Sequence, residues 1–260
     1  MRFKGKTVVV TGAASGIGRA TAMRLAIEGA DLVLSDIQPA GLSELTDQIV
    51  GAGGNRPKVV VGDISREDVA KEIVDTAIES LGRIDALVNC AGVHHIGDID
   101  QTSLEDWNRV IGTNLTSMFL LIRSVIPYMV KQRSGAIVNL SSVSAFVGQE
   151  MGETSTFLYN VTKAGVRQLT TSLATRYAAQ GIRVNCVCPG GVHTRMAISE
   201  EQERDPRIRD AILAAMSAGH PMRRVAEPSE IAAAICFLAS DEASFVTGTA
   251  MPVDGGYLAQ

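Results

Sequence analysis

Short apolar runs alternate with longer helical patterns along the whole chain, and no repeat or low-complexity segment interrupts them. The runs Val8-Val9-Val10 and Val59-Val60-Val61 are apolar at consecutive positions, which is typical of strands covered on both faces of a parallel sheet. The pattern predicts strands at 7–11, 31–35, 58–62, 84–89, 136–141, 182–188 and 249–253. Helices are expected at 18–28, 42–50, 68–80, 104–131, 162–180 and 228–239.

This alternation predicts one doubly wound α/β domain over residues 1–260, with a seven-stranded, mostly parallel sheet and helices on both faces. The alternation of strands and helices is interrupted at about 195–226 by a charged segment and a short helical pattern at 208–218. An excursion of this length either covers a substrate site or is a solvated surface insertion.

Composition narrows the class of protein. Hydrophobic residues make up 46% of the chain, which indicates a globular protein. Lys and Arg number 24 against 28 Asp and Glu, so nucleic acid and anionic membranes are not expected as partners. The longest apolar run, 231–239, is shorter than the roughly 20 residues of a membrane span, and no secretory segment follows the amino terminus. We expect a soluble, cytoplasmic protein.

Cysteine and histidine offer little for a metal or disulfide framework. The four cysteines are too few and too scattered for a disulfide scaffold, and three of them lie in apolar segments. No pair of histidines has the spacing of a helical metal site. No metal is expected.

A glycine-rich turn follows the first predicted strand and opens the first helix. We call residues 11–18, Thr-Gly-Ala-Ala-Ser-Gly-Ile-Gly, the glycine loop. Glycines there permit a sharp turn and a close approach to a diphosphate, which the N–H groups at the helix start would bind. Asp36 follows the second strand, eighteen positions past Gly18, near the spacing of a carboxylate that binds an adenosine ribose. The expected dinucleotide contacts in the loop are Gly12, Ser15, Gly16, Ile17 and Gly18.

Asp36 favours NAD over NADP as the cofactor. Its carboxylate can accept hydrogen bonds from two ribose hydroxyls, whereas it repels a 2′-phosphate. At ~4 Å and an effective dielectric near 20, one such pair of charges costs about 4 kcal/mol. No basic residue stands at Ser15 or Ile37 to compensate. The alternative interpretation of Asp36 is an aspartate that caps a turn.

A phenol and an ammonium stand four positions apart at Tyr159 and Lys163, so on a helix they share one face. A tyrosine with a pKa of about 10 exchanges protons poorly at neutral pH, and a nearby cation lowers that pKa. Upstream, a predicted strand ends in Ser141 and Ser142, and ligands bind at the carboxyl ends of parallel strands. Either serine could hold a substrate oxygen while the tyrosine moves the proton.

With these motifs the sequence resembles the short-chain dehydrogenase/reductase family over essentially its whole length, which implies a Rossmann-type domain. The motifs that carry the resemblance are the glycine loop, Asn89-Cys90-Ala91-Gly92, Asn114, Ser142, Tyr159 with Lys163, and residues 189–194. The resemblance implies that Tyr159 is the general acid/base and that Ser142 orients the reacting oxygen. It also implies that Lys163 lowers the tyrosine pKa and binds the nicotinamide ribose, and that Asn114 holds a relay water.

Further positions enter through the same resemblance. It implies that Asp63 and Ile64 lie beside the adenine and that His193 supports a loop. A homotetramer is implied, in which the helices ending near 131 and 180 pair across an interface. The remaining expected cofactor contacts are Asn89, Ala91, Gly92, Pro189, Gly190, Val192 and Thr194.

One departure from the family concerns the substrate entrance. Ser142 and Tyr159 are seventeen positions apart, whereas the usual gap is shorter by roughly four residues, about one helical turn. The extra residues fall within 149–156, so they should reshape the pocket. The expected substrate contacts are His94, Ser144, Gln149 and Met196, although histidines at a loop start are more often exposed.

The sequence therefore predicts an NAD-dependent oxidoreductase that interconverts a secondary alcohol and a ketone. Two alternatives stay open: a 3-oxoacyl thioester reductase and a non-catalytic NAD-binding sensor protein. The expected substrate is a small molecule, and an alicyclic or aromatic alcohol fits the residues as well as a polyol or sugar does.

Overall fold

The computed structural model describes residues 1–151 and 154–260, and seven strands form one parallel sheet in the order β3-β2-β1-β4-β5-β8-β9. The order reverses between β1 and β4, and such a switch point is where open α/β sheets bind ligands. The predicted doubly wound fold is confirmed, with strand ends shifted by a few residues. The strands are β1 (Thr7–Thr11), β2 (Asp31–Asp36), β3 (Lys58–Val61), β4 (Ala86–Asn89), β5 (Gly135–Leu140), β8 (Ile182–Pro189) and β9 (Ala250–Val253).

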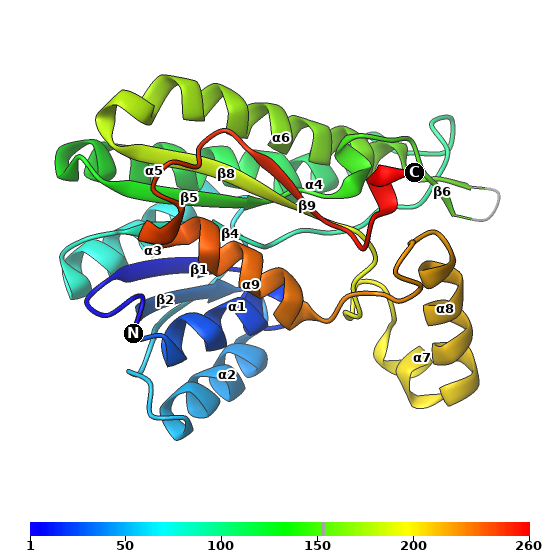
Figure 1. The fold of residues 1–260 in the computed structure, drawn as a ribbon, viewed down its shortest axis with the longest axis horizontal. Coiled ribbons are helices and arrows are strands. Elements are labelled where there is room, and N and C mark those ends of the chain that lie inside the picture. Colours follow the sequence, from blue (N-terminus) through cyan, green and yellow to red (C-terminus); the bar gives the residue numbers. More distant parts are fainter. Residues whose placement is uncertain (152–153) are drawn as a thin grey trace.

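Helices cover both faces of the sheet (Figure 1). One face carries α1 (Gly16–Ile27), α2 (Pro39–Gly51) and α9 (Pro228–Ala239); the other carries α3 (Glu67–Leu81), α4 (Leu104–Ile111), α5 (Ser117–Gln132) and α6 (Phe157–Tyr177). Val8 and Val10 of β1 enter the first of the two cores, and Val9 enters the second. Both faces of the strand are therefore buried, which explains its unbroken apolar run. The same prediction for the run 59–61 is wrong, because β3 is the last strand on its side of the sheet and Val59 and Val61 are exposed.

The long helix expected at 104–131 is interrupted by a π-helical turn, η1 (Gly112–Thr116). The continuous stretch Leu104–Gln132 is long and apolar enough to cross a membrane by length and composition alone. Half of its most apolar part is buried inside the molecule, and Met118 and Leu121 belong to the core against the sheet. The stretch therefore packs as a core helix of this domain.

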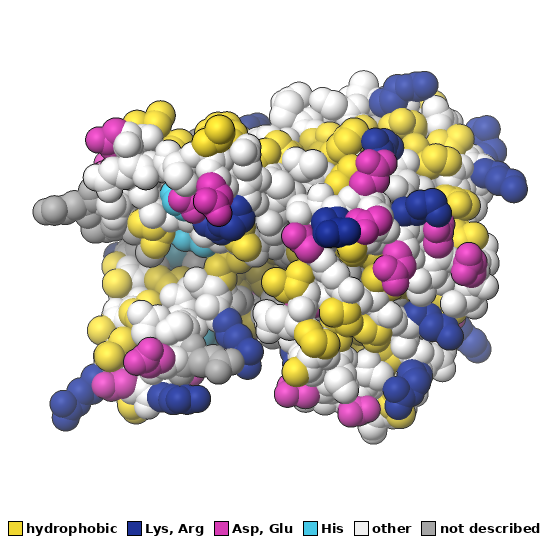
Figure 2. Space-filling view, turned by 180° about the vertical axis from the view of Figure 1, so that it is seen from behind, with side chains coloured by type: hydrophobic (Ala, Val, Ile, Leu, Met, Phe, Trp, Pro, Cys, Tyr) yellow, Lys and Arg dark blue, Asp and Glu magenta, His cyan; other side chains and the backbone are white. Residues whose placement is uncertain are grey.

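Two segments extend beyond the sheet and its helices. The excursion expected at about 195–226 contains α7 (Glu200–Arg204) and α8 (Pro206–Ala218), and Figure 2 shows the molecule hollowed between this part and the main body. The extra residues within 149–156 form a short antiparallel hairpin of β6 (Glu150–Met151) and β7 (Thr154–Ser155), which the sequence did not predict. Residues 152 and 153 of that insert lie outside the described residues. The remaining turns are η2 (Val143–Ala145), η3 (Ala178–Gln180), η4 (Asp241–Ala243) and η5 (Tyr257–Ala259).

Candidate active site

The glycine loop fits a dinucleotide because its backbone is packed as only glycine allows. Gly12 has φ +65°, and a Cβ there would lie 2.7 Å from the Ala91 nitrogen. A Cβ on Gly18 would lie 2.1 Å from the Gly12 oxygen. Among the described residues, the side chain of Ser15 accepts no capping hydrogen bond from the start of α1. The first N–H groups of this helix are thus left to bind an anion such as a diphosphate.

Asp36 lies beside the glycine loop at the carboxyl end of β2. Its Oδ2 accepts a hydrogen bond from the Ala14 nitrogen at 3.0 Å, and its Oδ1 accepts one from the Gln38 nitrogen at 3.0 Å. The carboxylate therefore caps local turns, and each oxygen keeps a further lone pair for a ribose hydroxyl. Both interpretations of Asp36 are compatible with this geometry.

A basic group that the sequence pattern did not predict, Arg19, also lies at this end of the loop. Arg19, in the first turns of α1, donates from Nη1 to the Ala14 oxygen at 3.2 Å, and its Nη2 lies 3.6 Å from Glu44. Its position one helical turn past Ser15 could have signalled that it faces the loop. The nearby carboxylate of Glu44 offsets its charge.

Ser142, Tyr159 and Lys163 come together at the carboxyl end of β5. The Ser142 and Tyr159 hydroxyls share a hydrogen bond. Lys163 donates from Nζ to the Leu140 oxygen at 2.8 Å and lies 5.3 Å from the centre of the Tyr159 ring. Ser141 is buried and donates its hydroxyl to the Lys163 oxygen at 2.9 Å, so it faces away from the phenol. The geometry thus favours Ser142 over its neighbour.

Burial dominates the electrostatics of this cluster. Burial raises the pKa of Tyr159 to about 12, and the hydrogen bond with Ser142 acts in the opposite direction. Burial also lowers the pKa of Lys163 to about 8. Lys163 is not among the groups that shift the tyrosine pKa in the protein chain by itself, and its amine bonds a backbone carbonyl. That Lys163 lowers this pKa therefore stays a prediction.

Asn114 lies in the π-helical turn η1 and joins two segments. Its Oδ1 accepts from the Val93 nitrogen at 2.8 Å, and its Nδ2 donates to the Val93 oxygen at 2.9 Å and to Thr162 Oγ1 at 3.1 Å. Both amide hydrogens are used, so a relay water would have to bond another atom of this residue. A Cβ on Gly92 would lie 3.3 Å from Asn114 Oδ1 and 3.7 Å from Lys163 Nζ, which places the residue-89–92 motif against the cluster.

The segment 189–194 crosses the glycine loop. A Cβ on Gly16 would lie 3.4 Å from Thr194 Cγ2, and Val192 forms a parallel bridge with Ala226. His193 lies 3.1 Å from a carboxylate oxygen of Glu203, which ties the segment to α7. Pro189, which ends β8, and Gly190 precede this crossing.

A buried histidine that the sequence analysis did not single out anchors the same segment. His220 Nε2 accepts from the Gly191 nitrogen at 2.9 Å, and its Nδ1 lies 2.8 Å from the Met216 oxygen. The ring therefore carries its proton on Nδ1 and is fixed between α8 and the loop. Only its position between a glycine and a proline marked it in the sequence.

At three of the positions expected to contact the cofactor, the side chain has partners within the protein chain. Asn89 is buried and donates from Nδ2 to Asn139 Oδ1 at 2.8 Å, and its own Oδ1 has no partner in the described part of the chain. Ile64 is buried in the core, and Asp63 accepts from the Ser65 nitrogen at 2.9 Å. The Asn89 side chain therefore cross-links β4 and β5, and the contact of this residue with a cofactor stays a prediction.

The substrate side begins at His94, whose ring centre lies 4.6 Å from that of Tyr159. Burial lowers the pKa of this imidazole, and the expectation that it is exposed is wrong. Ser144 is buried beside Ser142, with 3.0 Å between their hydroxyl oxygens, and contacts Gln149. Met196, by contrast, is 52% exposed. Three of the four expected substrate residues thus lie within reach of the catalytic hydroxyls.

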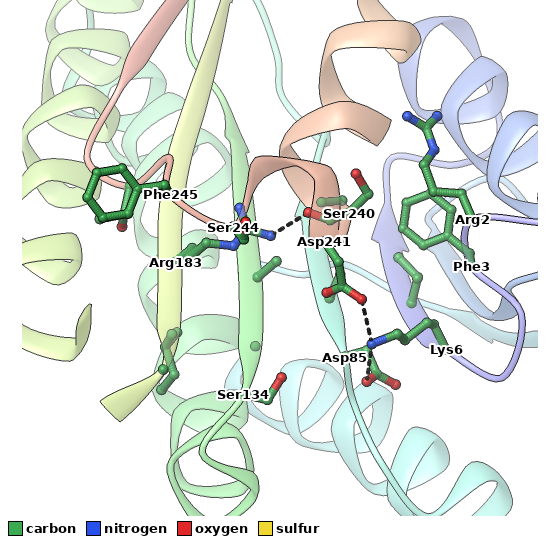
Figure 3. A pocket seen from close by; sticks show the side chains of 18 of the residues that line it. Arg2, Phe3, Lys6, Asp85, Ser134, Arg183, Ser240, Asp241, Ser244 and Phe245 are labelled. Carbon is green, nitrogen blue, oxygen red and sulfur yellow. Dashed lines mark hydrogen bonds and ion pairs between the residues drawn. The ribbon is translucent and has the colours of Figure 1, made fainter. Parts of the chain in front are cut away.

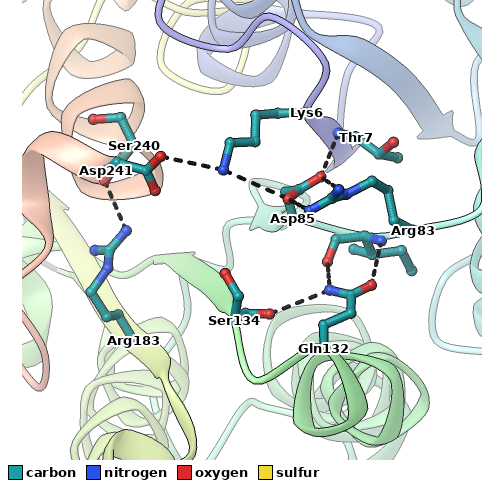
Figure 4. Close-up of polar contacts among 10 residues, drawn as sticks. Lys6, Thr7, Arg83, Asp85, Gln132, Ser134, Arg183, Ser240 and Asp241 are labelled. Atoms are coloured by element: carbon teal, nitrogen blue, oxygen red, sulfur yellow. Dashed lines mark hydrogen bonds and ion pairs between the residues drawn. The ribbon is translucent and has the colours of Figure 1, made fainter.

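A second hollow, of about 470 Å³, lies at the opposite edge of the sheet (Figure 3). On its rim, Lys6 pairs with both Asp85 and Asp241, and Arg183 donates to the Ser240 oxygen (Figure 4). Arg183 also donates to the Leu238 oxygen. The hollow contains none of the expected site residues. We name it the amino-edge cavity.

Comparison with known proteins identifies the family. A family model described as enoyl-(acyl carrier protein) reductase matches residues 12–258. The 3-oxoacyl-[acyl-carrier-protein] reductase FabG of Thermotoga maritima is 40% identical over 98% of this chain and 99% of its own. The meso-2,3-butanediol dehydrogenase of Serratia marcescens is 38% identical over 98% and 96%. The structure of levodione reductase is 34% identical, with a TM-score of 0.90 over 99% of both chains. The chain belongs to the short-chain dehydrogenase/reductase family of oxidoreductases, whose members generally bind a nicotinamide cofactor.

Proposed function

We propose that this protein is an NAD-dependent oxidoreductase that interconverts a secondary alcohol and a ketone. The observation that carries the proposal is the meeting of Ser142, Tyr159 and Lys163 at the carboxyl edge of the sheet, beside a glycine loop packed for a dinucleotide. The similarity to the Serratia marcescens dehydrogenase and to levodione reductase supports the same class of reaction.

A nicotinamide held beside the glycine loop would supply the hydride chemistry of the reaction. The chain supplies the proton chemistry: Tyr159 takes the hydroxyl proton in oxidation and donates it in reduction. Ser142 orients the reacting oxygen by a hydrogen bond. Lys163, partly neutral near its pKa of about 8, and Asn114 connect the phenol to solvent and to the cofactor ribose. His94 packs on the tyrosine ring and helps to exclude water.

Asp36 supports NAD as the cofactor. Its carboxylate stands at the loop where an adenosine ribose would bind, and a 2′-phosphate there would meet a like charge. Arg19 is the one basic group that we find bonded to the loop among the described residues, and Glu44 offsets it.

A 3-oxoacyl thioester reductase is the second candidate. The 40% identity to the Thermotoga maritima enzyme and the description of the matching family model favour it. Asp36 argues against it if such a reductase is to use NADP. A non-catalytic NAD sensor is disfavoured, because a sensor has no use for a buried amine beside a phenol, and burying an amine is energetically costly.

We also propose a cytoplasmic homotetramer. Large apolar side chains stand exposed on three separate segments: Phe119 on α5, Val161 on α6, and Phe245 before β9. Such exposure on long helices and at a sheet edge is typical of surfaces that pack against further subunits.

The test is a panel of secondary alcohols, ketones and 3-oxoacyl thioesters, each with NAD(H) and NADP(H), followed by absorbance of the reduced cofactor. We expect turnover with NAD(H) and a loss of at least about 10³-fold in Tyr159→Phe, with cofactor binding retained. Near-normal turnover in that variant would refute the role of the phenol. Turnover of thioesters alone would select the second candidate, and silence across the panel with bound NAD would select the sensor.

A further inference from the structure

A chain of hydrogen bonds leads away from Ser142 into the substrate side. Ser142 donates to Ser144 Oγ at 3.0 Å, Ser144 donates to Gln149 Oε1, and Gln149 donates from Nε2 to Tyr257 Oη at 3.3 Å. The chain joins the end of β5, the extra segment and the carboxyl-terminal turn η5, which Figure 1 shows beside the hairpin. Segments distant in sequence thus converge next to the reacting groups.

Gln149 is held firmly at the base of the hairpin. Its carbonyl oxygen accepts from the Thr156 nitrogen at 3.2 Å and from Thr156 Oγ1 at 3.0 Å. The far side of the hairpin is tied to the loop after β4, because Gly97 donates to the Ser155 oxygen at 2.9 Å and Ser155 donates to Asp98 Oδ1 at 3.1 Å. These contacts fix the backbone of Gln149, from which the side-chain amide extends to Ser144 and Tyr257.

The Gln149 amide keeps hydrogen-bonding capacity beyond the contacts with Ser144 and Tyr257. An amide has two N–H groups and an oxygen with two lone pairs. The contact with Ser144 uses one lone pair, and the contact with Tyr257 uses one N–H group. One donor and one acceptor remain, which is the complement of a hydroxyl group. The side chains of Ser144, Gln149 and Tyr257 are uncharged in this arrangement, so the chain favours a neutral oxygen over a carboxylate.

We propose that Ser144 and Gln149 form a second-oxygen subsite, which binds a hydroxyl on the carbon next to the reacting carbon. The substrate class is then a neutral vicinal diol and the matching 2-hydroxy ketone. This inference rests on the proposed function. The oxygens of Ser142 and Ser144 are 3.0 Å apart, about one hydrogen-bond length, and the two oxygens of a gauche vicinal diol have a similar separation.

The direction of the chain gives the second hydroxyl a role in the reaction. Ser142 has one proton, which it donates to Ser144, so its oxygen accepts from the protonated Tyr159 hydroxyl. To donate that proton to the reacting oxygen or to the phenolate, Ser142 must give up the bond to Ser144. A second substrate hydroxyl that donates to Ser144 replaces the bond, whereas a simple alcohol does not. One neutral hydrogen bond corresponds to roughly a five- to tenfold difference in kcat/KM.

The experiment compares 2,3-butanediol with 2-butanol, and 3-hydroxy-2-butanone with 2-butanone, as matched substrate pairs for the purified full-length protein. We expect the wild type to prefer the oxygenated member of each pair by roughly tenfold. Gln149→Met and Ser144→Ala should each bring the ratio close to one, mainly through slower turnover of the diol. Gln48→Met, an exposed glutamine on α2, is the matched control and should leave the ratio unchanged.

Equal rates on both members of each pair in the wild type, or a preference that survives both substitutions, would overturn the subsite. The proposed function would stand in either case, because both results require NAD-dependent turnover of an alcohol or ketone. Silence toward every alcohol and ketone in the wider panel would overturn the function and the subsite together.

Discussion

Charged side chains lie at both the carboxyl ends (the carboxyl edge) and the amino ends (the amino edge) of the strands, but their partners differ. At the carboxyl edge, the Lys163 amine bonds a backbone carbonyl, and burial lowers its pKa to about 8. At the amino edge, Lys6 faces the carboxylates of Asp241 at 3.3 Å and Asp85 at 3.8 Å (Figure 4). Asp85 also accepts hydrogen bonds from Nε and Nη2 of Arg83 and from the Thr7 nitrogen.

The difference shows that enclosed volume is a poor guide to chemistry in this protein. The amino-edge cavity has a volume of about 470 Å³, yet its charges are matched by partners within the chain. The carboxyl edge instead holds a phenol and an amine whose pKa values burial shifts in opposite directions. Groups in a cleft whose pKa values are strongly shifted are candidates for a functional site.

Asp36 lies at the carboxyl edge. Replacing it by alanine should lower the ratio of kcat/KM with NAD to kcat/KM with NADP by about two to three decades, because the repulsion of a 2′-phosphate is removed. The measurement is kcat/KM with each cofactor. Asp31→Ala, at the other end of β2, is the control and should leave the ratio as in the wild type. An unchanged ratio in Asp36→Ala would remove the ribose contact from the proposal.

Replacing Lys163 by methionine should raise the free energy of unfolding by about 2–3 kcal/mol at pH 6, even though turnover is lost. The lysine pKa is about 8 in the folded chain against 10.5 unfolded, so below pH 8 the fold bears a buried charge. As the pH rises from 8 to 10.5 the folded lysine loses its proton, and the advantage of the variant disappears. Urea unfolding at pH 6 and pH 10 measures this change, and an advantage independent of pH would contradict a buried, desolvated amine.

Replacing Asp85 by alanine should lower the free energy of unfolding by about 2 kcal/mol, since the Thr7 nitrogen and the Arg83 guanidinium lose their partner. The kcat/KM of the folded enzyme should not change. Chemical denaturation and steady-state kinetics on the same samples test both statements. A substantial fall in kcat/KM would show that the amino-edge cavity takes part in function.

Replacing Lys6 by methionine should change the free energy of unfolding by no more than about 0.5 kcal/mol, because its partner Asp241 is highly exposed and solvent screens the pair. The same denaturation experiment serves here. A loss as large as that of Asp85→Ala would mean that the ion pairs of the cavity act as one coupled network.

Local sequence determined most of the fold and the identity of the reacting groups. The unbroken valine runs of β1 and β3, the glycine loop and the four-residue spacing of Tyr159 and Lys163 each depend on neighbours in the chain, so their period and composition carry the information. Boundaries were less determined: α6 begins at Phe157, five residues before the expected start, and thereby includes Tyr159.

Only the tertiary structure decided which of these groups meet and in what state. It turned Ser141 toward the Lys163 backbone, packed His94 on Tyr159, and brought Tyr257 from the end of the chain to Gln149. It also set the direction of the pKa shifts, since desolvation depends on how many distant segments cover a group. These properties arise from contacts between residues far apart in sequence, and no local pattern encodes them.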